Sequence, residues 1–407
     1  MKLGVILGFA AVLAMSGTAS GQEVFSLSNT VRIGVLTDMS SIYADIGGQG
    51  SVEAARMAIA DFGGTVNGKR IDLISADHRN NPDLGAAIAN QWFAYNGVDA
   101  IAGASTSNVA LAIQEVAHSR NKLLLISGAA ASDLTGRACS PTSVHWTYDT
   151  VALANGTGSG VVKSGGSTWY FITADYAFGY DLERDTSKVV RQNGGSVLGS
   201  VRSPLGTSDF SPFLLKAQAS RANVIGLANA GGDTINSIKQ ASKLGIAGGG
   251  QKLVALLLFI SDVHSLGLQT AQGLRLTSAF YWDQNDATQA WSRRFFDRMK
   301  RQPTMVQAGV YGSIMHYLAA IKATGTSDGP AVVKQMKATP VNDFMTKNGH
   351  IREDGTLVRD MYLFEVKSPS ESRGPWDYYK QIAVIPGEEA FKLLGPNECY
   401  MTRSYSN

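Results

Sequence analysis

The sequence predicts an α/β protein with two lobes, each holding a doubly wound parallel sheet that is covered by helices on both faces. Three observations lead to this prediction. Short apolar segments alternate with amphipathic segments of helical length, which is the pattern of parallel strands joined by crossover helices. The alternation runs to residue 127 and restarts at residue 169. With 407 residues, the chain is also too long for a single hydrophobic core.

The first block of this pattern begins at Val31. Its apolar runs, such as VRIGVL and KLLLIS, are typical of strands that are buried on both faces of a sheet. The predicted strands are 31–39, 69–76, 98–103 and 122–127, and the predicted helices are 50–62, 83–95 and 109–119.

The second block repeats the order of strands and helices. The predicted strands are 169–173, 196–201, 223–228, 252–259 and 275–280, and the predicted helices are 179–193, 212–220 and 233–244. Residues 288–324 and 329–338 are predicted to be helical, and 349–366 to form a hairpin around the turn signal Glu353-Asp354-Gly355. The GTGSG segment at 156–160 does not follow a strand, so it indicates close packing of small residues and not a phosphate-binding loop.

The N-terminus resembles a secretory signal peptide over residues 1–20. A positive start at Lys2 precedes an apolar run over 3–15, and small residues follow, with a cleavage site expected between Ala19 and Gly21. The run is shorter than the roughly 20 apolar residues that span a bilayer. An exported, periplasmic protein is therefore expected, with an N-terminal membrane anchor as the alternative.

The composition excludes several kinds of function. Lysine and arginine total 36 against 33 acidic residues, so neither nucleic acid nor a membrane surface is an expected partner. No GxGxxG follows the first strand, no P-loop or GxSxG occurs, and the six histidines lack metal-ligand spacing. We therefore predict no catalytic residue, no cofactor and no metal, and a protein that is not an enzyme.

The chain has two cysteines, Cys139 and Cys399, both in polar, loop-like sequence. In an exported protein such a pair is expected to form a disulfide, which would join the C-terminal tail to the middle of the chain. Two free thiols are the alternative.

Several motifs occur in an order that resembles a known family. They are VRIGVLTDMS before the helix GSVEAARMAIADF, then VNGKRIDLISADHRNNPDLG, IAGASTSNVALAIQEVA, LLLISGAAASDLTG, WYFITADYAFGYD and VYGSIMHYLAAIKATGT. Together they resemble the periplasmic solute-binding proteins of ABC importers, in the leucine/isoleucine/valine-binding branch. The resemblance extends over residues 31–394.

This resemblance implies the type I periplasmic-binding-protein fold, with two lobes that are joined by a three-strand hinge and close on a ligand in the cleft between them. The first lobe would hold residues 31–147 and 283–350, and the second 148–282 and 351–400. The resemblance implies two partners, a small carboxylate ligand and a membrane permease. It also implies a monomeric protein. No reaction is implied.

The family holds the ligand carboxylate with hydroxyl and backbone N–H groups of two first-lobe loops. By this resemblance, Ser105, Thr106 and Ser107 form one loop at a helix N-terminus, which suits an anion. The alternative is that these hydroxyls only cap the helix. Ala129, Ala130 and Ala131 stand in the second loop where the family often has a threonine, so backbone contacts are expected there.

The resemblance also places second-lobe residues at the cleft. Tyr176 matches an aromatic residue that closes over the ligand, and Phe178 either joins it or belongs to the core. Asn229 and Ala230 follow a predicted strand, at the edge where ligands bind. Asp262 either meets a ligand ammonium group or caps the following helix.

Tyr281-Trp282-Asp283, with TWYFITADYAFGYD and HWTYDTVALANGTG, resembles the subgroup that imports aromatic acids of the benzoate, cinnamate and phenylpropanoid type. Tyr43, Tyr176, Tyr281 and Trp282 would supply stacking surfaces, with a core role as the alternative for Trp282. The first ligand hypothesis is thus an aromatic acid, and the second is a branched-chain or other aliphatic amino acid. A ligand-sensing receptor and a secreted α/β enzyme are the alternatives from other classes.

Overall fold

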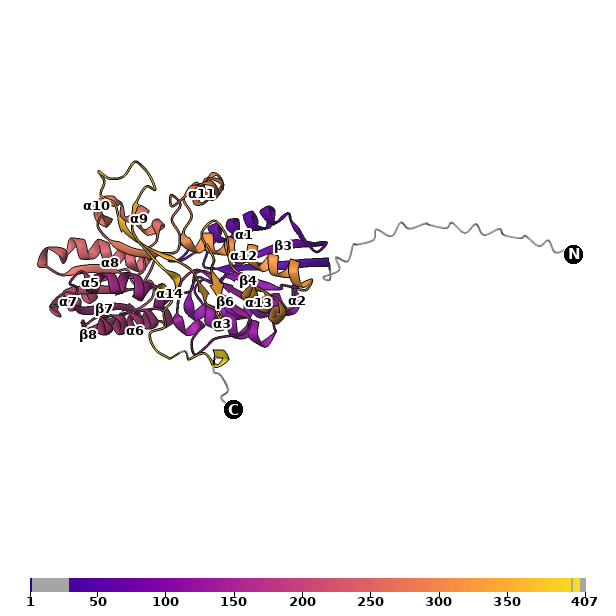
Figure 1. Cartoon of the computed structure of the whole chain (residues 1–407), viewed down its shortest axis with the longest axis horizontal. Helices are drawn as coiled ribbons and strands as arrows, with labels where there is room; N and C mark the ends of the chain where they lie inside the picture. Colours follow the sequence, from indigo (N-terminus) through magenta and orange to yellow (C-terminus); the bar gives the residue numbers. More distant parts are fainter. Residues whose placement is uncertain (2–28, 397, 403–407) are drawn as a thin grey trace.

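The computed structural model describes Met1, residues 29–396 and residues 398–402. Two lobes lie side by side, each with its own parallel sheet (Figure 1). The predicted signal peptide and its cleavage site lie outside the described residues. No helix within the described ranges is long and apolar enough to cross a membrane.

The first lobe contains a six-stranded sheet in the order β2-β3-β1-β4-β5-β6. All neighbouring pairs are parallel except the short hairpin of β2 with β3. The central strands are buried because helices cover both faces, which explains their continuous apolar sequence. The strands are β1 (Thr30–Thr37), β2 (Thr65–Val66), β3 (Lys69–Asp77), β4 (Ala100–Gly103), β5 (Leu123–Ile126) and β6 (Ser143–His145).

Two groups of helices cover this sheet. α2 (Pro82–Tyr95) packs on α3 (Ser107–Ser119), while α1 (Gly48–Phe62) packs on α12 (Met305–Thr324). Asn81 and Thr304 cap α2 and α12, each accepting a hydrogen bond from the first turn of its helix. α11 (Asp286–Met299) lies against α1, and α13 (Gly329–Ala338) lies against α12.

The second lobe contains a four-stranded, fully parallel sheet in the order β10-β9-β7-β8. Gly156 lies in the π-turn η3 (Ala154–Gly158), where an added Cβ would come within 2.3 Å of Thr277 Oγ1, so GTGSG is a close-packing segment. The strands are β7 (Thr168–Ala174), β8 (Ser196–Ser203), β9 (Val224–Ala228) and β10 (Lys252–Ala255). The helices are α4 (Thr150–Leu153), α5 (Ser159–Lys163), α6 (Ala177–Gln192), α7 (Ser211–Ala219), α8 (Gly232–Lys243), α9 (Ile260–Leu266) and α10 (Leu268–Ala271).

The predicted hairpin at 349–366 is split between two sheets. β12 (His350–Ile351) and β13 (Leu357–Val358) pair around the expected turn. β14 (Met361–Val366) instead joins an antiparallel sheet with β11 (Arg275–Ser278) and β15 (Tyr379–Ile385). Three links therefore connect the lobes: after β6, after β11 and after β13.

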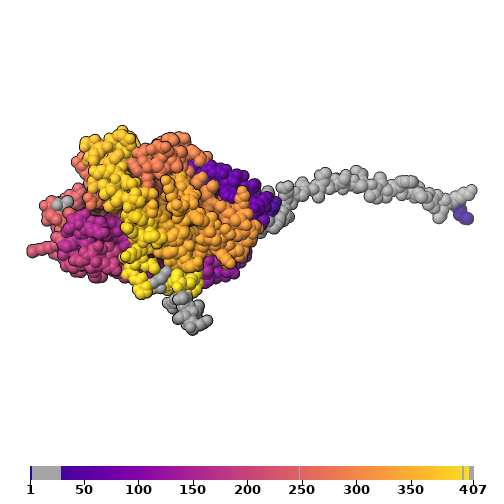
Figure 2. Space-filling view, viewed as in Figure 1, coloured from indigo at the N-terminus to yellow at the C-terminus, as the bar shows by residue number. Residues whose placement is uncertain are grey.

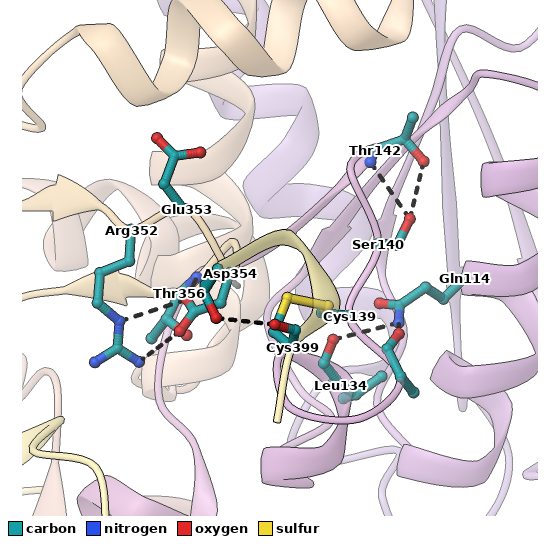
Figure 3. Close-up of a disulfide and its surroundings, with 12 residues drawn as sticks. Gln114, Leu134, Cys139, Ser140, Thr142, Arg352, Glu353, Asp354, Thr356 and Cys399 are labelled. Carbon is teal, nitrogen blue, oxygen red and sulfur yellow. Dashed lines mark hydrogen bonds and ion pairs between the residues drawn. A yellow bond between two sulfur atoms is a disulfide. The ribbon is translucent and has the colours of Figure 1, made fainter. Parts of the chain in front are cut away.

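A disulfide joins Cys139, in the loop after the 3-10 turn η2 (Ser132–Leu134), to Cys399 near the C-terminus (Figure 3). This is the pairing expected from the sequence. After α14 (Gly387–Ala390), the chain is held by Asn155 Nδ2, which donates to the carbonyls of Ala390 and Lys392 at 3.0 Å each. The C-terminal segment, yellow in Figure 2, consequently runs over the boundary between the lobes.

Candidate ligand-binding site

A cavity lies between the two lobes, at the carboxyl ends of the strands of both parallel sheets. It encloses about 270 Å³ of space between atoms, including solvent at its mouth. None of the side chains around it is charged. The lining residues are Tyr43, Ile46, Ser105, Ser107, Gly128, Ala130, Tyr148, Tyr176, Phe178, Ala230, Leu257 and Phe259.

Ser105 follows β4 and is placed by a tight backbone turn. Ala104, just before it, has a left-handed φ of 51°. Ser105 Oγ accepts a hydrogen bond from the backbone N–H of Asp38 at 2.9 Å. Gly128 lies so close that an added Cβ would be 2.7 Å from Ser105 Cα, so a residue without a side chain is required there.

Ser107 is the first residue of α3 and lies beside the second loop. Its Oγ accepts the backbone N–H groups of Ala130 at 3.3 Å and Ala131 at 3.2 Å, and Ala129 N donates to the carbonyl of Ala104 at 2.8 Å. These backbone donors therefore have partners within the protein, although backbone contacts with a ligand were expected from this loop. Because its oxygen already accepts these bonds, the Ser107 hydroxyl presents its proton to the cavity.

Two tyrosines meet across the cavity. Tyr43, held by its backbone N–H donating to Asp38 Oδ2 at 2.9 Å, approaches Tyr176 with a hydroxyl–hydroxyl distance of 2.6 Å. Both side chains are buried, and burial raises the pKa of both phenols. Neutral hydroxyls thus join the first lobe to the second at the edge of the cavity.

The second-lobe wall is apolar. Phe178, Ala230, Leu257 and Phe259 form it, and each is buried. Tyr148, in the link after β6, meets Phe259 edge-to-face with ring centroids 6.3 Å apart. Its hydroxyl donates to the carbonyl of Gly128 at 2.8 Å, so the ring offers the cavity mainly its apolar surface.

An ionic cluster also joins the lobes, on the hinge side of the cavity. In α6, Arg184 Nη1 lies 2.6 Å from Asp181 Oδ1. The same atom lies 3.2 Å from Oδ1 of Asp133, a residue that follows β5 in the first lobe. Ser132 Oγ donates to Asp185 Oδ2 at 2.6 Å. The Arg184–Asp133 and Ser132–Asp185 contacts cross between the lobes, whereas the Arg184–Asp181 pair lies within α6.

Seven of the residues predicted to bind ligand line the cavity, and seven do not. The first seven are Tyr43, Ser105, Ser107, Ala130, Tyr176, Phe178 and Ala230. The other seven, which do not line it, are Thr106, Ala129, Ala131, Asn229, Asp262, Tyr281 and Trp282.

Polar partners explain why three of these side chains do not line the cavity. Thr106 Oγ1 donates to Asn80 Oδ1, which turns it away from the cavity. The amide of Asn229 donates to Ser237 Oγ at 3.1 Å and accepts from Thr234 Oγ1 at 2.8 Å. Asp262 Oδ2 accepts from Phe259 N at 2.9 Å, so it caps α9, which is the alternative given for it above.

Tyr281 and Trp282 belong to an aromatic cluster that packs against the third sheet. The Tyr281 hydroxyl and Trp282 Nε1 donate to the carbonyl of Trp376 at 3.2 and 2.8 Å. The Tyr281 ring lies 4.9 Å from that of Tyr379. Trp282 is half-buried and packs against the hydrophobic core, which fits the core role given above as its alternative.

Five lining residues escaped the sequence prediction: Ile46, Gly128, Tyr148, Leu257 and Phe259. The strand predicted at 252–259 was too long, since β10 ends at Ala255. Leu257 and Phe259 lie in the loop that follows, where ligand contacts are expected in parallel sheets. The end of the strand is not visible in the sequence, because the apolar run LLLF continues past it. A shorter predicted strand would have placed Leu257 and Phe259 in the following loop.

Comparison with known proteins identifies the family. Residues 30–374 match the family model described as "Periplasmic binding protein". The chain belongs to this family. It therefore has the type I periplasmic-binding-protein fold and is an extracytoplasmic solute-binding component of an ABC transporter, a class that binds small molecules and works with a permease.

Individual relatives agree with this assignment. A crystal structure of a periplasmic binding protein from Burkholderia mallei is 52% identical, has a TM-score of 0.91, and covers 92% of this chain and 100% of its own. Leu/Ile/Val-binding protein homolog 6 of Brucella melitensis is 23% identical, over 88% of this chain and 91% of its own length. A solute-binding protein from Rhodopseudomonas palustris in complex with 4-hydroxybenzoate shares the fold, with a TM-score of 0.78, 23% identity, and coverage of 88% and 97%.

Proposed function

We propose that this protein captures a small aromatic carboxylate, of the benzoate or cinnamate type, and delivers it to the permease of an ABC importer. The observation that carries the proposal is the cavity itself. One end presents the hydroxyls of Ser105 and Ser107, and the other end is formed by apolar and aromatic side chains. A flat acid needs one anion site and a stacking surface, and this cavity offers both.

The absence of charge around the cavity argues against an α-amino acid. An amino acid would bring an ammonium group into a buried site, where an unpaired charge is costly. The lining residues include no carboxylate, and the carboxyl group of Asp262 accepts a hydrogen bond from the backbone N–H of Phe259. A ligand with one negative charge and no positive charge fits this arrangement.

The cavity size also supports a small ligand. The space of about 270 Å³ includes solvent at the mouth, so the part enclosed by the two lobes is smaller than this. An aromatic acid with a single ring suits this space better than a peptide or a sugar chain.

In this proposal the ligand stabilises the closed form, because only that form surrounds it with both walls. The moving bodies would be residues 31–147 with 283–350 and residues 148–282 with 351–400, and the three links would bend. No bond is made or broken. Export would use the N-terminal signal sequence, with cleavage between Ala19 and Gly21, and the protein would act as a monomer.

A branched-chain or other aliphatic amino acid is the second candidate ligand, favoured by the Leu/Ile/Val-binding relatives. An isothermal titration of the purified mature protein, refolded once to remove co-purified ligand, separates the two. We expect heat of binding and a raised melting temperature with benzoate, 4-hydroxybenzoate or cinnamate, because a ligand that binds only the native state stabilises it. Binding of leucine or valine, with no response to the aromatic acids, would overturn the proposal.

A further inference from the structure

His78 lies behind the polar end of the cavity and does not line it. It follows β3 directly and is fully buried. Its Nε2 atom is 3.3 Å from Ser105 Oγ, the oxygen that faces the ligand space. Whether this ring donates or accepts a hydrogen bond therefore affects whether the Ser105 hydroxyl can donate one into the cavity.

The hydrogen bonds of His78 determine its tautomer. Its Nδ1 accepts the backbone N–H of Asn80 at 3.1 Å, so that nitrogen carries no proton. Burial lowers the pKa of His78 to about 4, which makes the ring neutral at ordinary pH. A neutral imidazole has one N–H, and here it must be on Nε2. His78 is thus a donor to Ser105 Oγ.

Two further donors reach the same oxygen. The backbone N–H of Asp38 is 2.9 Å away and Thr37 Oγ1 is 3.1 Å away, and neither residue lines the cavity. A hydroxyl oxygen accepts about two hydrogen bonds and donates one, so three donors more than fill its lone pairs. None of these three groups accepts the Ser105 proton, which is therefore left for the ligand.

We propose that His78 is a positioning residue: it commits the Ser105 hydroxyl to donate into the cavity, and so selects a ligand group that accepts hydrogen bonds, a carboxylate oxygen. This inference deepens the proposed function and rests on it. An acceptor at position 78 would instead take the Ser105 proton, and the hydroxyl would then have no proton to donate to the ligand.

Residues with left-handed backbone angles flank the His78–Ser105 contact and hold its two sides in place. Arg79 and Asn80 have left-handed φ angles of 52° and 53°, and Ala104 on the other side has 51°. Such residues cost free energy unless their surroundings hold them. Asp77 Oδ1 accepts from Arg79 N at 2.8 Å, and Asp38 Oδ2 accepts from Asn80 Nδ2 at 2.9 Å. The structure therefore holds Asn80 N against His78 Nδ1.

A first test needs no ligand. Long-range ¹H–¹⁵N NMR of the histidine rings, assigned by comparison with His78→Gln, reports tautomer and charge directly. We expect a neutral Nε2–H ring from pH 5 to pH 8. A protonated ring in that range, or an Nδ1–H tautomer, would overturn the inference.

A second test compares two substitutions of similar shape. His78→Gln keeps a side-chain N–H donor for Ser105, whereas an ionised glutamate in His78→Glu offers only acceptors. The probes are benzoate and its neutral amide, benzamide. We expect His78→Gln to keep the preference for benzoate within about threefold, and His78→Glu to reduce the benzoate-to-benzamide ratio by about tenfold or more. Protonation of the glutamate at lower pH should restore the ratio.

The outcomes separate the two hypotheses. If the wild-type protein binds leucine and not benzoate, the aromatic assignment fails, and the same variants are compared with leucine and leucinamide. Equal losses for carboxylate and amide in both variants would show a merely structural role and overturn the inference. His316→Gln and His316→Glu, at a histidine that contacts the carbonyl of Met336 away from the cavity, control for the cost of the substitution itself.

Discussion

The two lobes contribute walls of opposite chemistry to one cavity. The first-lobe wall contains Ser105 and Ser107, whose oxygens already accept hydrogen bonds from the backbone. The second-lobe wall contains Phe178, Leu257 and Phe259. Polar recognition is therefore concentrated in one lobe, and apolar burial in the other.

If the proposed function holds, this difference would couple binding to closure. A carboxylate would find its hydroxyl donors in the first lobe before the cleft closes. The apolar part of the ligand would leave water only when the second lobe covers it, and this burial would favour the closed state. The Tyr43–Tyr176 contact would form at the same step, because it joins the two walls.

The largest expected effect comes from placing a charge in the apolar wall. Leu257→Glu should weaken benzoate binding by about 100-fold or more, since an ionised carboxylate would face an anionic ligand in a buried site. Isothermal titration would measure it, with Leu257→Gln as the neutral control of similar shape and an expected loss of about tenfold or less. Equal losses in both variants would show that charge at this wall does not matter.

Removing a donor from the polar wall should have the next largest effect. Ser107→Ala deletes a hydroxyl that faces the cavity, and hydrogen bonds to charged groups contribute about 1.5–3 kcal/mol, or roughly 10- to 100-fold in affinity. Ser127→Ala is the matched control, because Ser127 is buried near the same loop, does not line the cavity and has no side-chain partner among the described residues. A carboxylate affinity unchanged by Ser107→Ala would contradict the anion site.

The contact between the walls should contribute less. Tyr176→Phe keeps the ring and removes the hydroxyl that meets Tyr43, so affinity should fall about three- to tenfold, the range for one neutral hydrogen bond. Tyr180→Phe, at an exposed residue of the same helix, should leave affinity unchanged. Equal affinities in the two variants would mean that the tyrosine pair does not stabilise closure.

The smallest expected effect is on pH dependence. Burial raises the pKa of Asp233 to about 6, and the charge of Asp233 in turn contributes to the raised pKa of Tyr176, so its field reaches the cavity. Above about pH 6, Asp233 is negative and disfavours a carboxylate ligand. Benzoate affinity should therefore fall about two- to threefold as the pH rises from 5 to 7.5.

Asp233→Asn should reduce this pH dependence, and titrations at a series of pH values would show it. A smaller dependence should remain, because burial raises the pKa of Asp262 to about 7 and its charge contributes to the raised pKa of Tyr148 in the cavity. His78 and the cavity tyrosines do not interfere, because the pKa of His78 is lowered to about 4 and those of the tyrosines are raised above their usual value. A rise in affinity with pH would contradict the assignment.

Much of the fold follows from local patterns in the chain. The positions of β1, β3, β7 and most helices were predicted from apolar periodicity. This works because each element buries apolar residues at the spacing that its own backbone geometry sets. The strand ends were less accurate. In LVALLLF the apolar residues continue past Ala255, although the backbone leaves the sheet there.

By itself, the sequence determined the two-block α/β pattern, the family, the paired cysteines and the loops that carry Ser105 and Ser107. Tertiary structure alone decided which residues in the loops after the strands face the cavity. Thr106 turns to Asn80 and Asp262 to its own helix, while Leu257 enters the cavity. The physical reason is that a loop side chain points where a left-handed residue such as Ala104, and partners distant in sequence such as Asp38, direct it.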